Sequence, residues 1–259
     1  MIHLFALLSL LLCGVCYTGF QNSSHFHNTG NRRSLLFLVF GGALLLRLLL
    51  AYTTHGFSND IACFAAWADR IFTLGPGQFY SAEMFTDYPP GFMYVLYLIG
   101  ALRSLLQIPY YSDLHILLLK LPAILCDIAC GFLLHREAVK RLHFSDLQGI
   151  FAASAYLFQP AVILNSSCWG QVDSVYTLMI ILMCLFLMKG NLLPAYAVYG
   201  LGVLLKPQML IFTPVLLTGI WDHVFLQDFS WRKFFYNLCG GLVVICGMLL
   251  LCAPFGLTA

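Results

Sequence analysis

Asp60 is the first residue in the chain whose type and position suit catalysis. It follows the residues Gly-Phe-Ser-Asn at 56–59 and precedes apolar positions that share one helical face: Ile61, Phe64, Ala65 and Ala68. An aspartate at a helix start serves as an N-cap, accepting hydrogen bonds from free backbone N–H groups. A carboxylate there also suits a general base that deprotonates an acceptor hydroxyl for attack on an activated carbon. The two roles are compatible, because capping would fix the carboxylate where a substrate arrives.

Asp87 is a second candidate carboxylate. Tyr88, Pro89 and Pro90 follow it, and two adjacent prolines restrict the backbone to a rigid, extended entry into the next segment. One interpretation is a solvated loop aspartate before a turn. The other is a second carboxylate that positions the acceptor or shares a divalent cation with Asp60. The sequence leaves both open.

The densest polar cluster occupies residues 165–173, between two apolar runs. Its members are Asn165, Ser166, Ser167, Cys168, Trp169, Gly170, Gln171, Val172 and Asp173. A hairpin loop would use small polar residues without needing Trp169, Gln171 and Asp173 together, so a binding role is favoured for these three. The alternative for Trp169 is an anchor at the membrane interface.

Lys206 is the single residue whose position most strongly suggests a function. It interrupts a long apolar run, and a charge inside such a run is costly enough to suggest a function. Snorkelling of its ammonium to the interface is the alternative. Because Pro207 and Gln208 follow at an expected helix break, the ammonium would suit a lipid-linked phosphate, with Gln208 beside it. Arg47, inside an earlier apolar run, is a weaker case of the same kind.

The elements that carry these residues are expected to be membrane helices. The 259 residues are 61% hydrophobic and 9% charged, whereas about a quarter of a soluble domain is charged. Apolar runs near the 20 or so residues that span a bilayer recur along the chain: 1–20, 34–53, 89–106, 113–134, 147–164, 173–188, 192–220 and 234–252. The first lacks a basic region and a cleavage site, which favours a membrane helix over a signal peptide.

Other classes of function are disfavoured. The net charge of +2 is scattered, and no basic cluster is interleaved with aromatic residues, so nucleic acid is not an expected partner. Most of the ten cysteines lie in apolar runs, where thiols behave as small hydrophobes. Cys13 and Cys16 form a CxxC without a βαβ context, and the eight histidines show no metal-binding spacing, so redox and zinc roles are also disfavoured.

The basic residues set the expected topology. The positive-inside rule places the groups near segment ends in the cytoplasm: Arg32 and Arg33; Arg136, Lys140 and Arg141; Lys189; Arg232 and Lys233. The order of these groups agrees with the rule if residues 54–112 form one external loop, in which 89–106 lies in the interface or dips into the membrane and returns. It also requires that 192–220 is two short helices that break at Lys206. The candidate residues fall on the external side: Asp60, Glu83, Asp87, Asp173 and Lys206.

At these motifs the chain resembles the GT-C superfamily of membrane glycosyltransferases, which use polyprenyl-phosphate-linked sugars. The matching elements are Asp60 with Trp67 downstream, Asp87-Tyr88-Pro89-Pro90, the run from Trp169 to Ser174, and Lys206-Pro207-Gln208, within residues 34–220. The chain looks most similar to the bacterial relatives of GPI-anchor mannosyltransferases. The glucosyltransferases of the asparagine-linked glycosylation pathway look similar at the Asp-Tyr-Pro-Pro and lysine positions.

The resemblance implies a single all-α, polytopic membrane domain over residues 1–259, with about eight transmembrane helices and interfacial helices in the external loop 54–112. It implies transfer of a hexose, mannose favoured, from a polyprenyl-phosphate donor to a hydroxyl of a glycan, lipid or protein acceptor. Asp60 would be the base, and Lys206 with residues near Trp169 and Gln171 would bind the donor phosphate. A bacterial plasma membrane is the expected location, with the endoplasmic reticulum as the alternative.

Two alternatives remain from the sequence. Members of this superfamily continue through several more helices, whereas the sequence here stops at Ala259, so we expect an incomplete enzyme or a fragment that is inactive without a partner. A secondary transporter would also carry broken helices and intramembrane charges. Transporters gather those charges near the bilayer midplane, often with inverted repeats, but here the polar residues favour one face and no repeat is evident.

Overall fold

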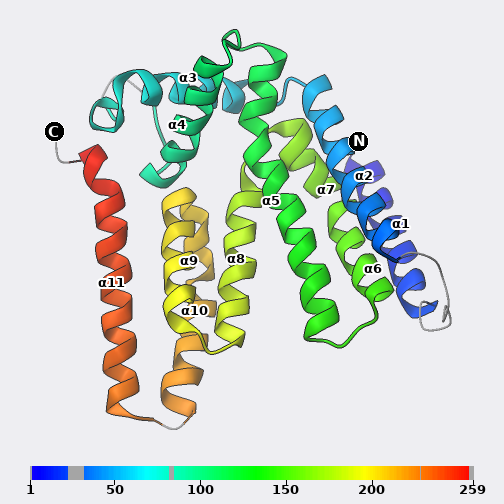
Figure 1. The fold of residues 1–259 in the computed structure, drawn as a ribbon, viewed down its shortest axis with the longest axis vertical. Coiled ribbons are helices and arrows are strands. Elements are labelled where there is room, and N and C mark those ends of the chain that lie inside the picture. The colour runs from blue at the N-terminus through cyan, green and yellow to red at the C-terminus, as the bar shows by residue number, and fades with distance from the viewer. Residues whose placement is uncertain (1, 23–31, 82–84, 228, 257–259) are drawn as a thin grey trace. The chain divides into compact units, whose positions relative to one another are not determined.

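The computed structural model describes residues 2–22, 32–81, 85–227 and 229–256, with side chains from residue 7 onward. Eleven α-helices joined by short 3₁₀ and π-helical turns form these ranges, and they contain no strand (Figure 1). The expected all-α class is therefore confirmed.

Four described helical segments are long and apolar enough to cross a membrane: α2 (Arg32–Thr53), α5 (Asp113–Lys140), Pro207–Leu226 and α11 (Trp231–Gly256). A fifth span results if α6 (Asp146–Leu157) is counted with Pro160–Trp169, which follows it after a 52° bend. The apolar helices Pro90–Leu105, Asp173–Met188 and Leu192–Leu205 have 14–16 residues, and helices this short do not cross roughly 30 Å of hydrocarbon upright. The described residues thus contain four or five candidate spans where the sequence suggested about eight.

The surfaces of these helices suit a membrane. Only 6% of the most apolar stretch of α11 and 17% of that of α2 are buried inside the protein. Leu242, Val243, Leu249 and Leu250 of α11 are all more than half exposed. In water so large an apolar surface would be a liability. Several long apolar helices with outward-facing apolar side chains therefore indicate a multi-pass membrane protein.

The chain forms two compact units. Unit 1 combines residues 1–62 with 111–174, and unit 2 combines residues 63–110 with 175–259.

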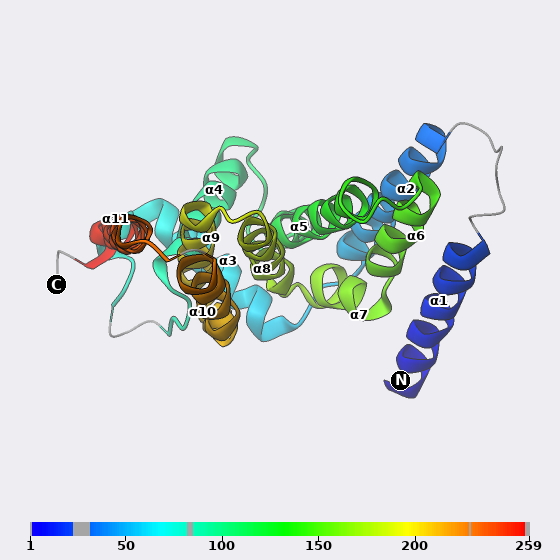
Figure 2. The same ribbon diagram turned by 90° about the horizontal axis from the view of Figure 1, so that it is seen from below.

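In unit 1, helices α2, α5 and α6 lie side by side, and α1 (Ile2–Asn22) packs against α6 (Figures 1 and 2). Small residues let the backbones approach closely, as is typical of membrane helices. A Cβ added to Gly131 of α5 would lie 2.6 Å from the Leu157 side chain of α6. Ser145 caps α6 in a reciprocal capping box with Gln148.

The apolar run 147–164, expected as one segment, is broken in the structure. Helix α6 ends at Leu157, and Pro160 opens the short helix α7 (Pro160–Ile163), which continues as a π-helical turn, η3 (Leu164–Trp169). Proline disfavours a helical conformation in the residue before it and cannot donate a backbone hydrogen bond, which accounts for the interruption.

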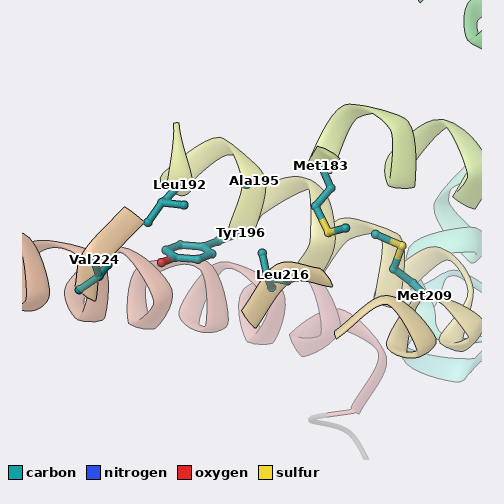
Figure 3. Packing of buried hydrophobic residues seen from close by; sticks show 7 residues of the cluster. All are labelled: Met183, Leu192, Ala195, Tyr196, Met209, Leu216 and Val224. Carbon is teal, nitrogen blue, oxygen red and sulfur yellow. The ribbon is translucent and has the colours of Figure 1, made fainter. Parts of the chain in front are cut away.

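In unit 2, helices α8 (Asp173–Met188), α9 (Leu192–Leu205) and α10 (Thr213–Trp221) lie side by side (Figures 1 and 2). A buried apolar cluster unites them (Figure 3): Met183, Leu192, Ala195, Tyr196, Met209, Leu216 and Val224. Helix α9 also contacts α4 (Pro90–Leu105) and α11. The predicted break in the run 192–220 is confirmed, because α9 ends at Leu205, the next residue Lys206 is extended, and Pro207 opens the 3₁₀ segment η4 (Pro207–Phe212).

Candidate functional site

The site in unit 1 forms where the end of α2 and the start of α3 (Ser58–Leu74) meet the connection from η3 to α8. The Phe57 backbone N–H donates to Trp169 O at 2.8 Å, and the Thr54 hydroxyl lies 3.3 Å from Ser167 O. Gly56 has φ of 80°, and a Cβ there would lie 2.7 Å from Trp169 O. Two segments more than 100 residues apart in the sequence are therefore joined through their backbones.

Asp60 lies at this junction, in the first turn of α3. It stands two residues inside the helix start, so the N-cap interpretation of its position is wrong. Its Oδ2 accepts hydrogen bonds from Trp169 Nε1 at 3.1 Å and from Gln171 Nε2 at 2.5 Å. Its Oδ1 accepts none from the described residues, and the side chain is partly exposed. One oxygen orients the carboxylate while the other remains available to a proton donor.

The turn that carries Trp169 and Gln171 is tightly specified. The Asn165 carbonyl accepts from the N–H groups of Gly170 at 3.1 Å and Gln171 at 2.9 Å. Gly170 has φ of 89°, a conformation that favours glycine, and a Cβ there would lie 2.5 Å from Ile61 Cδ1. Asp173 accepts from Asn165 Nδ2 at 2.9 Å. Of the three polar residues predicted to bind, Trp169 and Gln171 contact Asp60, whereas Asp173 pairs with Asn165 at the start of α8.

Lys120 supports this junction from α5, and the sequence analysis missed it. Its side chain is fully buried, and its Nζ donates to Thr54 O at 2.7 Å, Ser167 O at 3.0 Å and Ala51 O at 3.2 Å, with Thr54 Oγ1 at 3.1 Å. Two of these carbonyls belong to the last turn of α2 and the residue after it, where backbone oxygens lack partners within the helix. The cost of an intramembrane lysine, which singled out Lys206, would have identified Lys120 as well.

Asp127 is a second residue that the sequence analysis missed. Its carboxylate is fully buried and accepts from Arg47 Nε at 3.2 Å, Ser166 Oγ at 2.6 Å, Ser174 Oγ at 2.5 Å and Tyr156 OH at 3.1 Å. Two donors reach each oxygen. The expectation that Arg47 binds phosphate is not supported, because this guanidinium is itself fully buried and paired with Asp127.

Lys206 defines the site in unit 2. It directly follows α9 and is only 7% exposed, and its Nζ lies 5.8 Å from the ring centroid of Tyr88 and 5.6 Å from that of Tyr176. These distances allow cation–π attraction. Gly91 permits the close approach, since a Cβ there would lie 2.5 Å from Leu204 O. The lysine motif and the Asp-Tyr-Pro-Pro motif, 118 residues apart from Tyr88 to Lys206, therefore meet.

The two prolines behave as predicted. Pro89 is extended and Pro90 is the first residue of α4. Asp87, two residues before Pro89, is exposed, as is Gln208 on η4. The Tyr80 phenol donates to Tyr88 O at 2.9 Å, and burial raises the pKa of this phenol, so it stays protonated.

Trp67, one of the residues on which the resemblance to the GT-C superfamily is based, belongs to the core of unit 2. It is 2% exposed and packs against Phe64 and Tyr88, and its indole N–H donates to Phe85 O at 3.0 Å. Glu83 lies outside the described residues.

The predicted site residues fall into two groups. Asp60, Trp169, Gln171 and Asp173 belong to unit 1, and Asp87, Lys206 and Gln208 belong to unit 2. Among the described residues, no three His, Cys, Asp or Glu side chains form a group that could hold a metal ion. The sharing of a cation by Asp60 and Asp87 stays a prediction. No protein-family model matches the chain, and no curated protein sequence matches it.

Proposed function

We propose that the chain is a membrane glycosyltransferase of the GT-C type, which moves a hexose, mannose favoured, from a polyprenyl-phosphate donor to an acceptor hydroxyl at the external face. The proposal rests on the unequal hydrogen bonding of the two carboxylate oxygens of Asp60. Its Oδ2 is held by Trp169 and Gln171, and its Oδ1 accepts no hydrogen bond from the described residues. A general base needs this combination of fixed orientation and free basic oxygen.

In the proposed reaction, Asp60 Oδ1 takes the proton of the acceptor hydroxyl as the hydroxyl oxygen attacks the anomeric carbon of the donor. The bond from that carbon to the phosphate oxygen breaks, and its electron pair leaves with the polyprenyl phosphate. Trp169 is half exposed, and its ring offers an apolar face to a sugar beside the base. Asp173 then acts indirectly, by holding Asn165 and the turn that carries Trp169 and Gln171.

Lys206 supports the second half of the reaction. An ammonium in a mostly apolar setting attracts developing negative charge more strongly than one in water. Tyr88 and Tyr176 hold it near the end of α9, where it would stabilise the departing phosphate. Gln208 follows Lys206 by two residues, and Asp87 belongs to the same unit; both are exposed. We assign Gln208 to donor binding and Asp87 to acceptor positioning.

The test measures transfer of radiolabelled mannose from polyprenyl-phosphate mannose to a membrane lipid and glycan extract. Asp60→Asn keeps an oxygen that accepts from Trp169 and Gln171 but removes the base, so transfer should fall about 100-fold or more. Asp146→Asn, which removes an exposed carboxylate paired with Arg32, is the matched control and should keep wild-type transfer. Wild-type transfer by Asp60→Asn would refute the role of Asp60.

A secondary transporter is the second candidate, and the two interrupted helices favour it. The chain bends by 52° after Leu157 and is extended at Lys206, as at the broken helices of transporters. Solute uptake by the purified chain in sealed vesicles, without any transfer of label, would support it. Transfer only after a second membrane chain is added would instead indicate a partner-dependent glycosyltransferase.

A further inference from the structure

Two adjoining hollows in unit 2 are unused by the proposed reaction. Both involve α9 and α11, and they share one residue, Asn237. The first has a volume of about 410 Å³ and the second about 430 Å³. Their linings differ so strongly in polarity that together they match an amphipathic ligand.

The first hollow is an apolar groove between α9, α10 and α11. Tyr196, Leu216 and Val224, which appear in Figure 3, form part of its wall, and Gly241 and Leu242 of α11 form another part. Both α11 and the segment Pro207–Leu226 are candidate membrane spans, so the groove lies at the depth of lipid hydrocarbon. An empty groove there would forfeit dispersion contacts along its walls, whereas a hydrocarbon chain restores them.

The second hollow is basic. Arg232, Lys233 and His223 line it, together with the chain at the start of α9. Helices α9 and α11 both begin here, and neither has an acidic residue in its first turn. Because helix N-termini carry partial positive charge, the two cations of α11 stand at the end where the dipole disfavours them. An anion in the hollow would offset this concentration of positive charge.

The two cations of the basic hollow differ in their neighbours. The Lys233 ammonium donates to Gln227 O at 3.1 Å, and Asp222 accepts from Gln227 Nε2 at 2.7 Å. Asp228 lies outside the described residues. Arg232 is exposed, and its guanidinium forms no ion pair with the described residues.

Aromatic side chains indicate the depth of the basic hollow. Trp221, Phe225, Phe229 and Trp231 form a chain of ring contacts with centroids 4.7–5.8 Å apart, and each is more than a third exposed. Exposed tryptophans beside basic residues are typical of the membrane–water interface. The basic hollow would then lie at headgroup level, with the groove leading from it into the hydrocarbon.

We propose that these hollows bind one anionic phospholipid, with its phosphate in the basic hollow and one acyl chain in the apolar groove. The site is separate from the proposed glycosyl transfer and does not depend on it. Basic pockets between membrane helices at the cytoplasmic side suit anionic headgroups, and here the groove adds a place for the chain.

The headgroup is tested by native mass spectrometry of the full chain in detergent, titrated with phosphatidylglycerol or phosphatidylcholine. Phosphatidylglycerol should bind more tightly. Arg232→Gln should weaken its binding about fivefold, the effect of one cation near an anionic lipid. Arg33→Gln, an exposed cation at the start of α2, is the matched control and should change nothing. Equal binding of both lipids, or equal effects of both variants, would overturn the proposal.

The acyl chain is tested by filling the groove from α11. Cβ atoms at both Gly241 and Gly247 would meet nothing within 4 Å, but only Gly241 lines the groove. Gly241→Leu should lower phosphatidylglycerol occupancy at least tenfold, whereas Gly247→Leu, with the same gain in helix propensity, should not. Glycerol 3-phosphate serves as the probe without a chain. If it stabilises the protein as well as phosphatidylglycerol does, the groove holds no chain and the proposal fails.

Discussion

Asp60 and Asp127 are two carboxylates of unit 1 that bond to the same stretch of chain, residues 165–174, and differ in how they are satisfied. Asp127 is fully buried, with two donors on each oxygen. Asp60 is partly exposed, with two donors on one oxygen. An ionised carboxylate has about four acceptor sites, so Asp127 has no capacity left for a substrate. Asp60 retains half of its capacity, which distinguishes a candidate base from a structural residue.

The two buried lysines have different surroundings. Lys120 directs its ammonium to three backbone carbonyls and a hydroxyl of unit 1. Lys206 lies against two tyrosine rings of unit 2. The contacts of Lys120 join the end of α2 to the turn at Ser167. The ring contacts of Lys206 place its ammonium beside the Asp-Tyr-Pro-Pro motif.

The largest expected effect is that of Asp127→Ala. It leaves the buried Arg47 guanidinium without its carboxylate, and breaking one partner of a buried ion pair costs about 3–5 kcal/mol. The thermal unfolding midpoint in detergent should fall steeply. The double variant Asp127→Ala with Arg47→Met should recover part of the loss, because no charge stays buried. A single variant as stable as the wild type would break the distinction between the two carboxylates.

Lys120→Met should be the next most destabilising change. It leaves the carbonyls of Ala51, Thr54 and Ser167 without their shared donor, and a buried unsatisfied group costs about 1–3 kcal/mol. Lys140→Met is the matched control in the same helix, since Lys140 is exposed at the end of α5. If both variants unfold at the same temperature, Lys120 does not hold the junction together.

Much of the fold followed from local patterns. The apolar runs correspond closely to α2, α4, α8 and α11, because hydropathy and length determine membrane helices directly. The break at Lys206 followed from a lysine and a proline in succession. The bend after Leu157 was missed, although Pro160 signals it, because an uninterrupted apolar run around a proline resembles a single span.

The site was harder to predict, for a physical reason. The polar cluster was found because it interrupts apolar sequence, and so were Asp60 and Lys206. Asp127 and Lys120 were overlooked although each is also a charge inside a long apolar run, and their roles depend on partners 29 to 80 residues away. Spacing along a helix does not reveal such partners, since they come from packing between helices.

Gly170→Ala probes the turn that orients Asp60, with an intermediate expected effect. A Cβ at this position meets Ile61 Cδ1, and the positive φ of 89° adds strain, so the cost should be about 1–3 kcal/mol. Transfer should fall as well, because Trp169 and Gln171 would shift from Asp60. Gly42→Ala, in open space on α2, is the control for adding a methyl group. Unchanged transfer and stability in Gly170→Ala would show that the turn tolerates another geometry.

Asp60→Asn should have the smallest effect on stability, within about 0.5 kcal/mol, because a partly exposed amide replaces a partly exposed carboxylate. The same substitution is expected to abolish most transfer, so it separates a loss of chemistry from a loss of stability. The measurement pairs an unfolding midpoint with a transfer rate on one preparation. A substantial loss of stability would assign Asp60 the structural role of Asp127, and the loss of transfer would then reflect an unfolded junction. Stability retained with transfer lost requires a chemical role for the free oxygen of Asp60.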